Sequence, residues 1–587
     1  MNFQTRKSKK LKNRIKATKT SPLPKMSLSK TQYGLIFLNT AFRLYSSLYM
    51  IIGDCDETFN YWEPLNLLLR QFGKQTWEYS PVYAIRSYAY LIPYHIIGKI
   101  LHLFNVTPLN VFYGLRVIAL GGFTSFVELN LFANLDNYST NLANWWLFLT
   151  SVNVGMSHGG SALLPSSLAL QTTLLANTYI FKSTVISTEK VNDKGGNLLK
   201  AITWYFVGGL LGWPFALALG LPVGVYTLWQ ICQQRLSSVV LIKIGLILSS
   251  IVGAITFIDS YYLQKLVFVP INIVLYNVFG GEGEGPEIFG IEPLSYYILN
   301  LLLNFQFVLP LAALGVLINP FITTNAKKFS AIVSAQLVIW CGIFFSQPHK
   351  EERFMYPIYP LIVLSAAISV SKLTSLVKSK MPRFAYYAAQ FGFIAAVFVI
   401  SVLRIVNLVE NYAAPLEIYQ AVSQLPTSST QQVNVCTGKE WYHFPNSFHL
   451  PTNYRLKFVE SGFDGLLPGD FHEPTNSITE STTFIPSHMN NQNKFESDKV
   501  ISIEQCDYFV DNTQLESIPQ LIRPDLSVVD STKWYVLQCN KIINPNGKHN
   551  LIGRLVYIPQ WARRLVPYKV EYMDLCLLKR VREDEKV

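Results

Sequence analysis

The chain alternates long apolar stretches with short polar loops from Tyr33 to about Ile405. Each stretch holds about 20 mainly apolar residues, the length of helix that crosses the hydrocarbon core of a bilayer. The pattern therefore predicts a polytopic α-helical membrane protein of about eleven spans. The span 203–231 is long and carries Pro214 and Pro222, so it is either bent or divided into two segments. The expected spans are 33–53, 85–104, 111–134, 142–157, 162–181, 203–231, 238–258, 296–317, 329–347, 354–371 and 385–405.

The basic residues predict the orientation of these spans. Residues 1–30 hold ten Lys or Arg and no acid, so the positive-inside rule places a basic N-terminal tail, 1–32, in the cytoplasm. With an odd number of spans, Arg235 and the basic cluster 372–383 fall on the cytoplasmic side as well. The loop 182–202 carries four Lys on the predicted lumenal side, and it is the weakest point of this topology.

After the last span, residues 406–587 follow a different pattern. Short runs rich in β-branched and aromatic residues are separated by Pro, Gly and Asn turns, which predicts a folded α/β domain in the lumen. The membrane domain then comprises residues 33–405, with its first lumenal loop at 54–84. The runs that indicate strands are Val433–Cys436, Tyr508–Val510 and Trp534–Gln538.

Four cysteines lie in this C-terminal region. In an oxidising compartment they are compatible with two disulfides in any of three pairings, or they are reduced thiols buried as small apolar groups. The sequence does not choose between these possibilities. The four are Cys436, Cys506, Cys539 and Cys576.

Composition supports the membrane assignment. Apolar residues make up 50% of the 587 residues and charged residues only 15%, whereas about a quarter of a soluble domain is charged. The net charge of +12 could indicate nucleic-acid binding, but most of the excess lies in residues 1–30. A basic tail before a membrane span is explained by topology, so we expect no nucleic-acid partner.

Three carboxylates stand within four residues where the first span ends, at Asp54, Asp56 and Glu57. Crowded carboxylates at a boundary of low dielectric raise one another's pKa, which can produce a base suited to neutral pH. The same string also fits a helix N-cap at Asp54 or Asp56 followed by acids in the first turn. Trp62 and Glu63 follow in the same loop.

The second half of this loop mixes aromatic and charged residues, namely Trp77, Glu78, Tyr79 and Arg86. Trp and Tyr can stack on sugar rings, and they also concentrate in the headgroup region of a membrane. Composition alone therefore leaves both a sugar-binding role and an interfacial role open.

A second polar cluster, His349 to Arg353, precedes the span 354–371. Arg353 and Lys350 have the chemistry to bind phosphate, and His349 can hydrogen-bond the same group. Simple anchoring at the membrane surface is the alternative. The glycine-rich stretch Gly280–Glu287 lacks the Gly-Lys-Ser/Thr ending of a phosphate loop and carries three acids, which favours a mobile lid.

Three strings resemble glycosyltransferase family 22 of the GT-C superfamily, and the resemblance covers nearly the whole chain. They are DCDETFNYWEP from Asp54, QTWEYSPVYAIRSYAY from Gln75 and HKEERF from His349. Two strings of the C-terminal region, 436–445 and 461–471, are similar as well. NYWEP and TWEYSP are typical of the α-1,2-mannosyltransferases of the dolichol pathway within this family.

The resemblance implies a GT-C fold in the endoplasmic reticulum membrane, among its lipids, with a lumenal active site. It implies an inverting transfer of mannose from dolichyl-phosphate-mannose to Man6GlcNAc2 and Man8GlcNAc2 carried on dolichyl diphosphate. Asp56, with Glu57, is then the expected general base, and no metal or other cofactor is expected. The expected phosphate-binding residues are His349, Lys350 and Arg353. The expected substrate-binding residues are Asp54, Trp62, Glu63, Trp77, Glu78, Tyr79 and Arg86.

Three alternatives stay open at this point. Another dolichyl-phosphate-mannose-dependent enzyme, acting on an α-1,6 branch or on a glycosylphosphatidylinositol precursor, would share the spans and the acidic pair. A lipid or sugar transporter would show internal repeats and charges near the membrane midplane, whereas no repeat is found. The charges in the spans, Arg43, Arg116, Glu128 and Arg404, are scattered along the sequence. A structural subunit with inert carboxylates is the third alternative.

Overall fold

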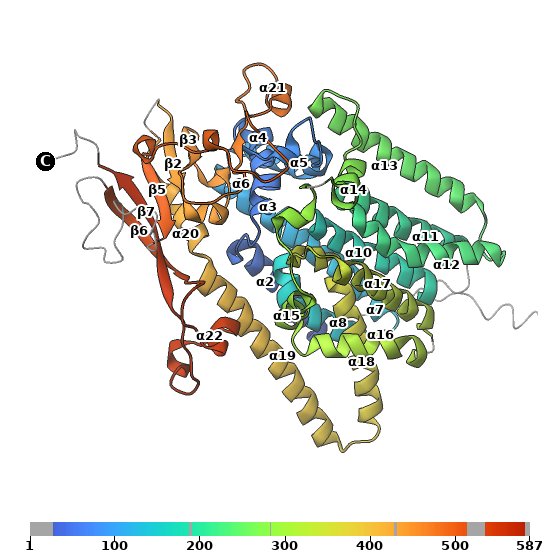
Figure 1. Cartoon of the computed structure of the whole chain (residues 1–587). Helices are drawn as coiled ribbons and strands as arrows, with labels where there is room; N and C mark the ends of the chain where they lie inside the picture. Colours follow the sequence, from blue (N-terminus) through green and yellow to red (C-terminus); the bar gives the residue numbers. More distant parts are fainter. Residues whose placement is uncertain are drawn as a thin grey trace, which may run out of the picture.

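A helical body carries a β-sheet domain at one end, and the long helix α19 (Arg383–Tyr412) connects the two (Figure 1). The computed structural model describes residues 28–186, 191–281, 283–323, 325–427, 431–512 and 534–581. Residues 1–27 of the expected basic tail, and Glu282 of the glycine-rich stretch, lie outside the described residues. The predicted class, a polytopic helical protein with a C-terminal sheet domain, is confirmed.

The helical body is built from helices and one short strand. They are α2 (Lys30–Tyr49), α3 (Cys55–Glu57), α4 (Glu63–Arg70), β1 (Lys74–Gln75), α5 (Tyr88–Leu103), α6 (Pro108–Leu115), α7 (Phe123–Asp136), α8 (Thr140–Val152), α9 (Val154–Gly159), α10 (Pro165–Phe181), α11 (Val191–Phe206), α12 (Leu221–Cys232), α13 (Val239–Leu263), α14 (Val269–Phe279), α15 (Leu294–Phe305), α16 (Val308–Ile322), α17 (Lys327–Ser346), α18 (Tyr359–Lys378) and α19. Those of the C-terminal domain are α20 (Ala414–Val422), β2 (Val433–Thr437), β3 (Tyr454–Phe458), β4 (Gly469–Asp470), α21 (Ile478–Thr483), β5 (Tyr508–Asn512), β6 (Trp534–Ile543), α22 (Leu551–Leu555) and β7 (Tyr572–Arg580).

Local sequence explains where several helices begin. Ser29 and Gln32 form a reciprocal capping box at the start of α2, and Asn153 caps α9 by accepting from the backbone of Met156. Pro165 occupies the first turn of α10, where its missing N–H costs no hydrogen bond. Among the described residues, six helices are long and apolar enough to cross a membrane, or seven if α15 and α16, which meet at 108°, form one broken span.

The C-terminal domain is built on a five-stranded mixed sheet in the order β3-β2-β5-β7-β6. The strands β3, β2 and β5 are parallel, and β7 runs antiparallel to both β5 and β6. The structure settles the pairing that the sequence left open. One disulfide joins Cys436 to Cys506, and the other joins Cys539 of β6 to Cys576 of β7.

The first long loop is tied to this domain through a strand pair and through a buried carboxylate. The short strands β1 and β4 pair in antiparallel register, with Lys74 opposite Asp470, and the two side chains form an ion pair of 2.8 Å. The carboxylate of Glu63 accepts hydrogen bonds from the Ser447 backbone N–H at 2.6 Å and hydroxyl at 2.8 Å. Glu63 is fully buried, so these bonds replace the water that a buried charge loses.

The expected span 85–104 forms α5, which has 16 residues and is not among the described helices that are long and apolar enough to cross a membrane. It follows directly on the loop that β1 ties to the sheet domain, and Gly98 near its end packs against Leu69 of α4. The next residue, Arg70, donates to the backbone carbonyls of Ser447 and Leu450 in the same domain. Both ends of α5 therefore adjoin segments that contact the sheet domain. An apolar stretch of this length suits a helix in the membrane surface as well as a span.

The expected span 203–231 is divided into two segments at the predicted proline, and the second, Pro214–Cys232, is long and apolar enough to cross a membrane. α11 continues as a π-helix to Gly212, and the chain turns at Trp213 and Pro214 before α12 runs back. Lys182 and Lys200 lie 5.0 and 5.3 Å from the ring of Tyr179, at the end of α10 that points away from the sheet domain. Two of the four lysines of the expected loop 182–202 therefore lie beside one aromatic ring, and the side of the membrane that they face stays a prediction.

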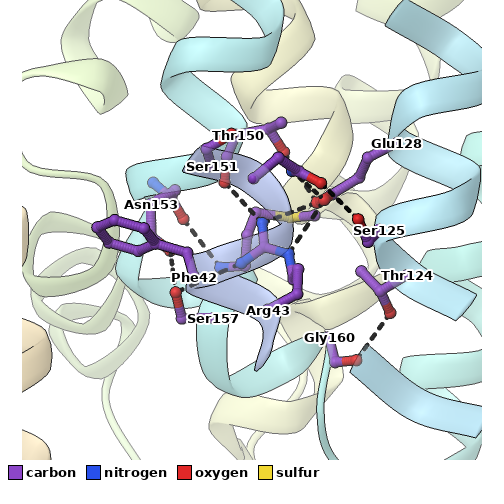
Figure 2. Close-up of polar contacts among 12 residues, drawn as sticks. Phe42, Arg43, Thr124, Ser125, Glu128, Thr150, Ser151, Asn153, Ser157 and Gly160 are labelled. Carbon is purple, nitrogen blue, oxygen red and sulfur yellow. Dashed lines mark hydrogen bonds and ion pairs between the residues drawn. The ribbon is translucent and has the colours of Figure 1, made fainter. Parts of the chain in front are cut away.

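A buried ion pair joins the first helices of the body (Figure 2). Arg43 of α2 binds both carboxylate oxygens of Glu128 on α7, at 2.8 and 3.0 Å, and the two residues are 1% and 0% exposed. The same guanidinium donates to the carbonyl of Thr150 on α8 at 2.7 Å. Asn39 donates to Oε2 of Glu128 at 2.7 Å, the oxygen that also accepts from Arg43 Nε. Ser157 of α9 also contacts Arg43, so this side chain joins α2 to α7, α8 and α9.

The interpretation of the intramembrane charges as scattered is therefore corrected. Arg43 and Glu128 are far apart in sequence but paired in space, and Arg116 donates to the carbonyl of Met50 at 2.7 Å. Arg404 donates to carbonyls of the sheet domain. These charges join parts of the fold and do not form a charged path near the midplane, which a transporter would require.

Arg43→Met should lower the free energy of unfolding by about 3 to 5 kcal/mol, because it leaves Glu128 buried without a cation. The measurement is thermal unfolding in detergent. Lys243→Met is the matched control, since Lys243 is an exposed cation on α13 and should shift the midpoint little. The double variant Arg43→Met with Glu128→Leu should lose less free energy of unfolding than the two single variants lose together. Equal midpoints for Arg43→Met and the control would show that the ion pair contributes nothing.

Candidate active site

A cavity of about 480 Å³ lies where the helical body meets the sheet domain. One part of its lining comes from the start of the first long loop, residues 54–61, and from residues 76–86. Residues 349–354 and helix α14 form further walls, and residues of the sheet domain complete the enclosure. The cavity is therefore assembled from segments that are hundreds of residues apart in sequence.

Arg353 stands among three carboxylates at the centre of this cavity. Its two terminal nitrogens contact Asp54 at 3.2 Å and Asp56 at 2.6 Å, and its Nε contacts Glu351. The Arg353 side chain is 14% exposed, whereas Asp56 is 32% exposed and open to the cavity. The structure thus brings together the acidic string of the first loop and the basic string at residues 349–353.

A second cation lies on the other side of Asp56. Arg86 binds both oxygens of Glu78, at 2.7 and 3.1 Å, and its Nη2 is 3.8 Å from Asp56 Oδ2. Its guanidinium also lies 5.8 Å from the ring of Tyr61. Glu78 fixes Arg86 in one orientation, since a bidentate pair holds the guanidinium plane. Asp56 is therefore placed between two guanidinium groups.

The same surroundings act differently on the two aspartates. Burial raises the pKa of Asp54 to about 7, and the nearby charge of Arg353 offsets only part of that rise. Burial also opposes ionisation of Asp56, but Arg353 and then Arg86 outweigh it and lower its pKa. His349 also loses hydration, yet its bond to Glu351 raises its pKa. At neutral pH the site therefore holds Asp56 as a carboxylate, with Asp54 close to its midpoint.

Local backbone structure explains why Asp56 rather than Glu57 faces the cavity. Asp54 caps the three-residue helix α3 by accepting from the Asp56 backbone N–H at 2.9 Å, so the capping interpretation holds for Asp54. The chain then winds into the π-helical turn Thr58–Trp62, whose residues are all buried. Such single π turns are frequent at functional sites. Glu57, the last residue of α3, points inward and accepts from Trp62 of this turn, while Asp56 stays at the surface of the cavity.

Seven of the expected residues line the cavity and five do not. Those that line it are Asp54, Asp56, Trp77, Glu78, Arg86, His349 and Arg353, and those that do not are Glu57, Trp62, Glu63, Tyr79 and Lys350. Glu57 is 3% exposed and accepts from Trp62 Nε1 and from the Leu163 backbone N–H, each at 2.9 Å. Lys350 points to backbone carbonyls, among them that of Glu292 at 2.8 Å.

The remaining expected residues outside the cavity hold the first loop in shape. Tyr79 donates to the carbonyl of Asn60 at 2.8 Å, and Thr76 donates to the side chain of the same residue at 2.6 Å. Glu63 joins the loop to the sheet domain. The polar groups of these side chains form hydrogen bonds within the protein, because buried polar groups need partners.

Several cavity residues carried no functional prediction from the sequence. Glu351 was visible in the basic string, but its contact with Arg353 depends on the turn before α18. Tyr276 comes from α14, a helix the span pattern missed, and its ring lies 5.1 Å from that of Trp77. Trp441 and Phe463 come from the sheet domain, with ring centroids 4.9 Å apart. They lie within the strings 436–445 and 461–471, which supported the family resemblance. That resemblance was the one sign in the sequence that these residues belong to the site.

The site contains a group of possible metal ligands. Among the described residues, ligand atoms of Asp54, Cys55 and Asp56 lie within 4.8 Å of one another. Both carboxylates already contact Arg353, whose positive charge opposes a cation at the same place. The expectation that no metal is needed stays a prediction.

Comparison with known proteins gives a consistent result. Residues 35–451 match the model of the Alg9-like mannosyltransferase family. Alpha-1,2-mannosyltransferase ALG9 of Saccharomyces cerevisiae is 38% identical over 95% of this chain and 100% of its own length. The protein of the same name from Schizosaccharomyces pombe is 35% identical over 94% and 98%. A crystal structure of ArnT from Cupriavidus metallidurans bound to undecaprenyl phosphate aligns with a TM-score of 0.45 and 11% identity over 74% of this chain and 87% of that chain.

Glu57→Ala should lower the free energy of unfolding by about 1 to 3 kcal/mol, because it leaves the Trp62 and Leu163 N–H groups buried without an acceptor. Glu57→Gln keeps a carbonyl oxygen at the same position, so its free energy of unfolding should fall much less than that of Glu57→Ala. Thermal unfolding of the two variants against the parent chain measures the difference. Unchanged midpoints in both variants would contradict a structural role for this carboxylate.

Proposed function

The chain belongs to the Alg9-like mannosyltransferase family, and from this premise we propose that it transfers mannose in α-1,2 linkage to a lipid-linked oligosaccharide. The donor is dolichyl-phosphate-mannose, and the acceptors are Man6GlcNAc2 and Man8GlcNAc2 on dolichyl diphosphate. The full-length relatives that carry the α-1,2-mannosyltransferase name support this choice over an α-1,6 or glycosylphosphatidylinositol enzyme. The transfer takes place in the endoplasmic reticulum, with the cavity facing the lumen and the N-terminus in the cytoplasm.

The contact between Arg353 and Asp56 is the observation that carries the proposal. Mannosyl transfer from a phosphate donor needs a carboxylate near the attacking hydroxyl and a cation near the departing phosphate. The 2.6 Å ion pair places one candidate for each role side by side in a single cavity. Asp56 is the general base, and Arg353 with His349 binds the phosphate. Lys350 and Glu57, which lie outside the cavity lining, support the loops that carry these residues.

The reaction is a single displacement. The acceptor 2-hydroxyl oxygen forms a bond to the anomeric carbon of mannose while its proton passes to the Asp56 carboxylate. The bond from that carbon to the phosphate oxygen breaks, and the electron pair leaves with dolichyl phosphate. The leaving group is a phosphomonoester of low pKa, so no acid is required to protonate it. The carbon inverts, and no covalent enzyme intermediate or metal enters the scheme.

Donor binding also prepares the base. Without substrate, Arg353 is shared by Asp54, Asp56 and Glu351. A phosphate that engages this guanidinium competes with the carboxylates and weakens the hold on Asp56. The influence that lowers the Asp56 pKa is then reduced, so the carboxylate becomes a stronger proton acceptor when the donor is present. The aromatic groups of Trp77, Trp441 and Phe463 provide faces on which sugar rings can stack.

The direct test is transfer by the purified chain from radiolabelled dolichyl-phosphate-mannose to defined lipid-linked acceptors. Labelled product with the Man6 and Man8 acceptors, removed by an α-1,2-specific mannosidase, supports the proposal. Transfer only to the acceptor of an α-1,6 enzyme, or only to a glycosylphosphatidylinositol precursor, would assign the chain to those alternatives. No product with any acceptor would favour a transporter or a structural subunit.

Asp56→Asn should lower kcat by roughly 100-fold to 10,000-fold, the usual contribution of a general base. The amide keeps the size of the carboxylate but cannot accept the proton, so KM should change little. Glu57→Gln is the matched control, because Glu57 lies outside the cavity and should retain most activity. Near-normal turnover in Asp56→Asn, with loss in Glu57→Gln, would exchange the two assignments.

Arg353→Ala should raise the donor KM or lower kcat by roughly tenfold or more, since a charge-assisted bond to phosphate contributes about 1.5 to 3 kcal/mol. Lys350→Ala is the control, because this neighbouring cation points away from the cavity. The variant should have a lower midpoint of thermal unfolding and a donor KM close to that of the parent chain. Initial rates at varied donor concentration separate the two effects. Unchanged donor kinetics in Arg353→Ala would mean that the cluster only anchors the loop.

A further inference from the structure

The C-terminal domain carries a segment whose composition differs from the rest of the domain. Residues 544–570 contain five Lys or Arg and no Asp or Glu. Within this segment the apolar side chains of Leu551, Trp561 and Leu565 are 72%, 78% and 80% exposed. Large apolar groups that project beside cations, without acids between them, are typical of surfaces that enter the headgroup layer of a membrane.

The segment is fixed to the last membrane helix, α19. Arg404 donates to the carbonyls of Arg554 and Leu555 at 2.9 and 3.1 Å, and the Tyr557 backbone N–H donates to the carbonyl of Leu403 at 3.0 Å. Figure 1 shows α22 beside α19, at the foot of the sheet. The projecting side chains therefore belong to a braced structure, because Arg563 also lies 4.6 Å from the ring of Tyr568.

The point of attachment on α19 coincides with a membrane boundary. At 1.5 Å per residue, the stretch of α19 from Arg383 to Leu403 spans about 30 Å, the thickness of a hydrocarbon core. Along this stretch Phe384 and Phe391 are 87% and 72% exposed, as expected of side chains that face lipid. After Arg383, the next charged residue of α19 is Arg404. The segment 544–570 thus meets α19 where the helix leaves the hydrocarbon on the side of the sheet domain.

We propose that residues 544–570 dock the sheet domain onto the bilayer surface beside α19. In this arrangement Trp561, Leu551 and Leu565 enter the acyl boundary, and Arg554 and Arg564 bind headgroup phosphates. The occupant of this surface is lipid, because the segment is level with the end of the lipid-facing stretch of α19 and because its charge complements phosphate. This contact then holds the sheet domain at the membrane surface in addition to its attachment through α19.

The test compares cysteine accessibility in the full chain reconstituted into phosphatidylcholine nanodiscs. Trp561→Cys is treated with a charged maleimide, and labelling is followed peptide by peptide with mass spectrometry. Gln432→Cys is the matched control, because Gln432 is exposed and precedes β2 at the end of the sheet where β7 finishes. The cysteine at 561 should be labelled at least about tenfold more slowly than the control, since a charged reagent is excluded from the acyl region. Leu565→Cys should behave in the same way.

A second measurement identifies what covers the segment. Phosphatidylcholine with a photoreactive group near the start of its acyl chain should cross-link to the peptide that contains Trp561 in the unsubstituted chain. Equal labelling rates at 561 and 432 in nanodiscs, without cross-linking, would overturn the proposal. Protection that is present in native membranes but absent in nanodiscs would also overturn it and would assign the surface to a protein partner.

Discussion

The buried pair of Arg43 and Glu128 is the constraint on which the arrangement of this protein depends. In a hydrocarbon surrounding, neither charge is tolerable without the other, and each must also satisfy its remaining hydrogen-bonding groups. Their partners lie on α2, α7, α8 and α9, so one relative placement of these helices meets the requirement. α2 ends just before the acidic string, and α9 leads to the residues that flank the cavity. Charge pairing inside the membrane thereby determines where the acids emerge from it.

Within the cavity, charge balance is the main physical issue. Four acids, Asp54, Asp56, Glu78 and Glu351, face two guanidinium groups and one imidazole. Full ionisation would leave a negative site that repels a phosphate-bearing substrate. The upward shift of the Asp54 pKa to about 7 and the raised pKa of His349 relieve this excess. When Asp54 is protonated, one fewer carboxylate competes with a phosphate for Arg353. The site can then keep Asp56 ionised as the base and still attract a phosphate.

The sequence predicted those properties that depend on composition and on short strings. It identified the helical class, the broken span at Pro214, and the two strings whose residues meet at Arg353. It failed where several structures fit the same local pattern. Residues 85–104 have the length of a span, but the helix that they form is shorter, Tyr88–Leu103, and its Gly98 packs against Leu69 of α4. Glu57 and Asp56 are adjacent carboxylates, and the turn Thr58–Trp62 separates their environments.

The tie between Glu63 and Ser447 has a consequence for the order in which the protein is made. The two residues are 384 positions apart, and at about 5 to 20 residues per second the ribosome needs about 20 to 80 s to synthesise the interval. During that time the first loop is outside the membrane without the partners that later bury it. The cavity cannot form until nearly the whole chain has emerged. A newly made chain that stops before Ser447 can insert its helices yet has no complete site, so the last domain to be synthesised controls when the protein becomes competent.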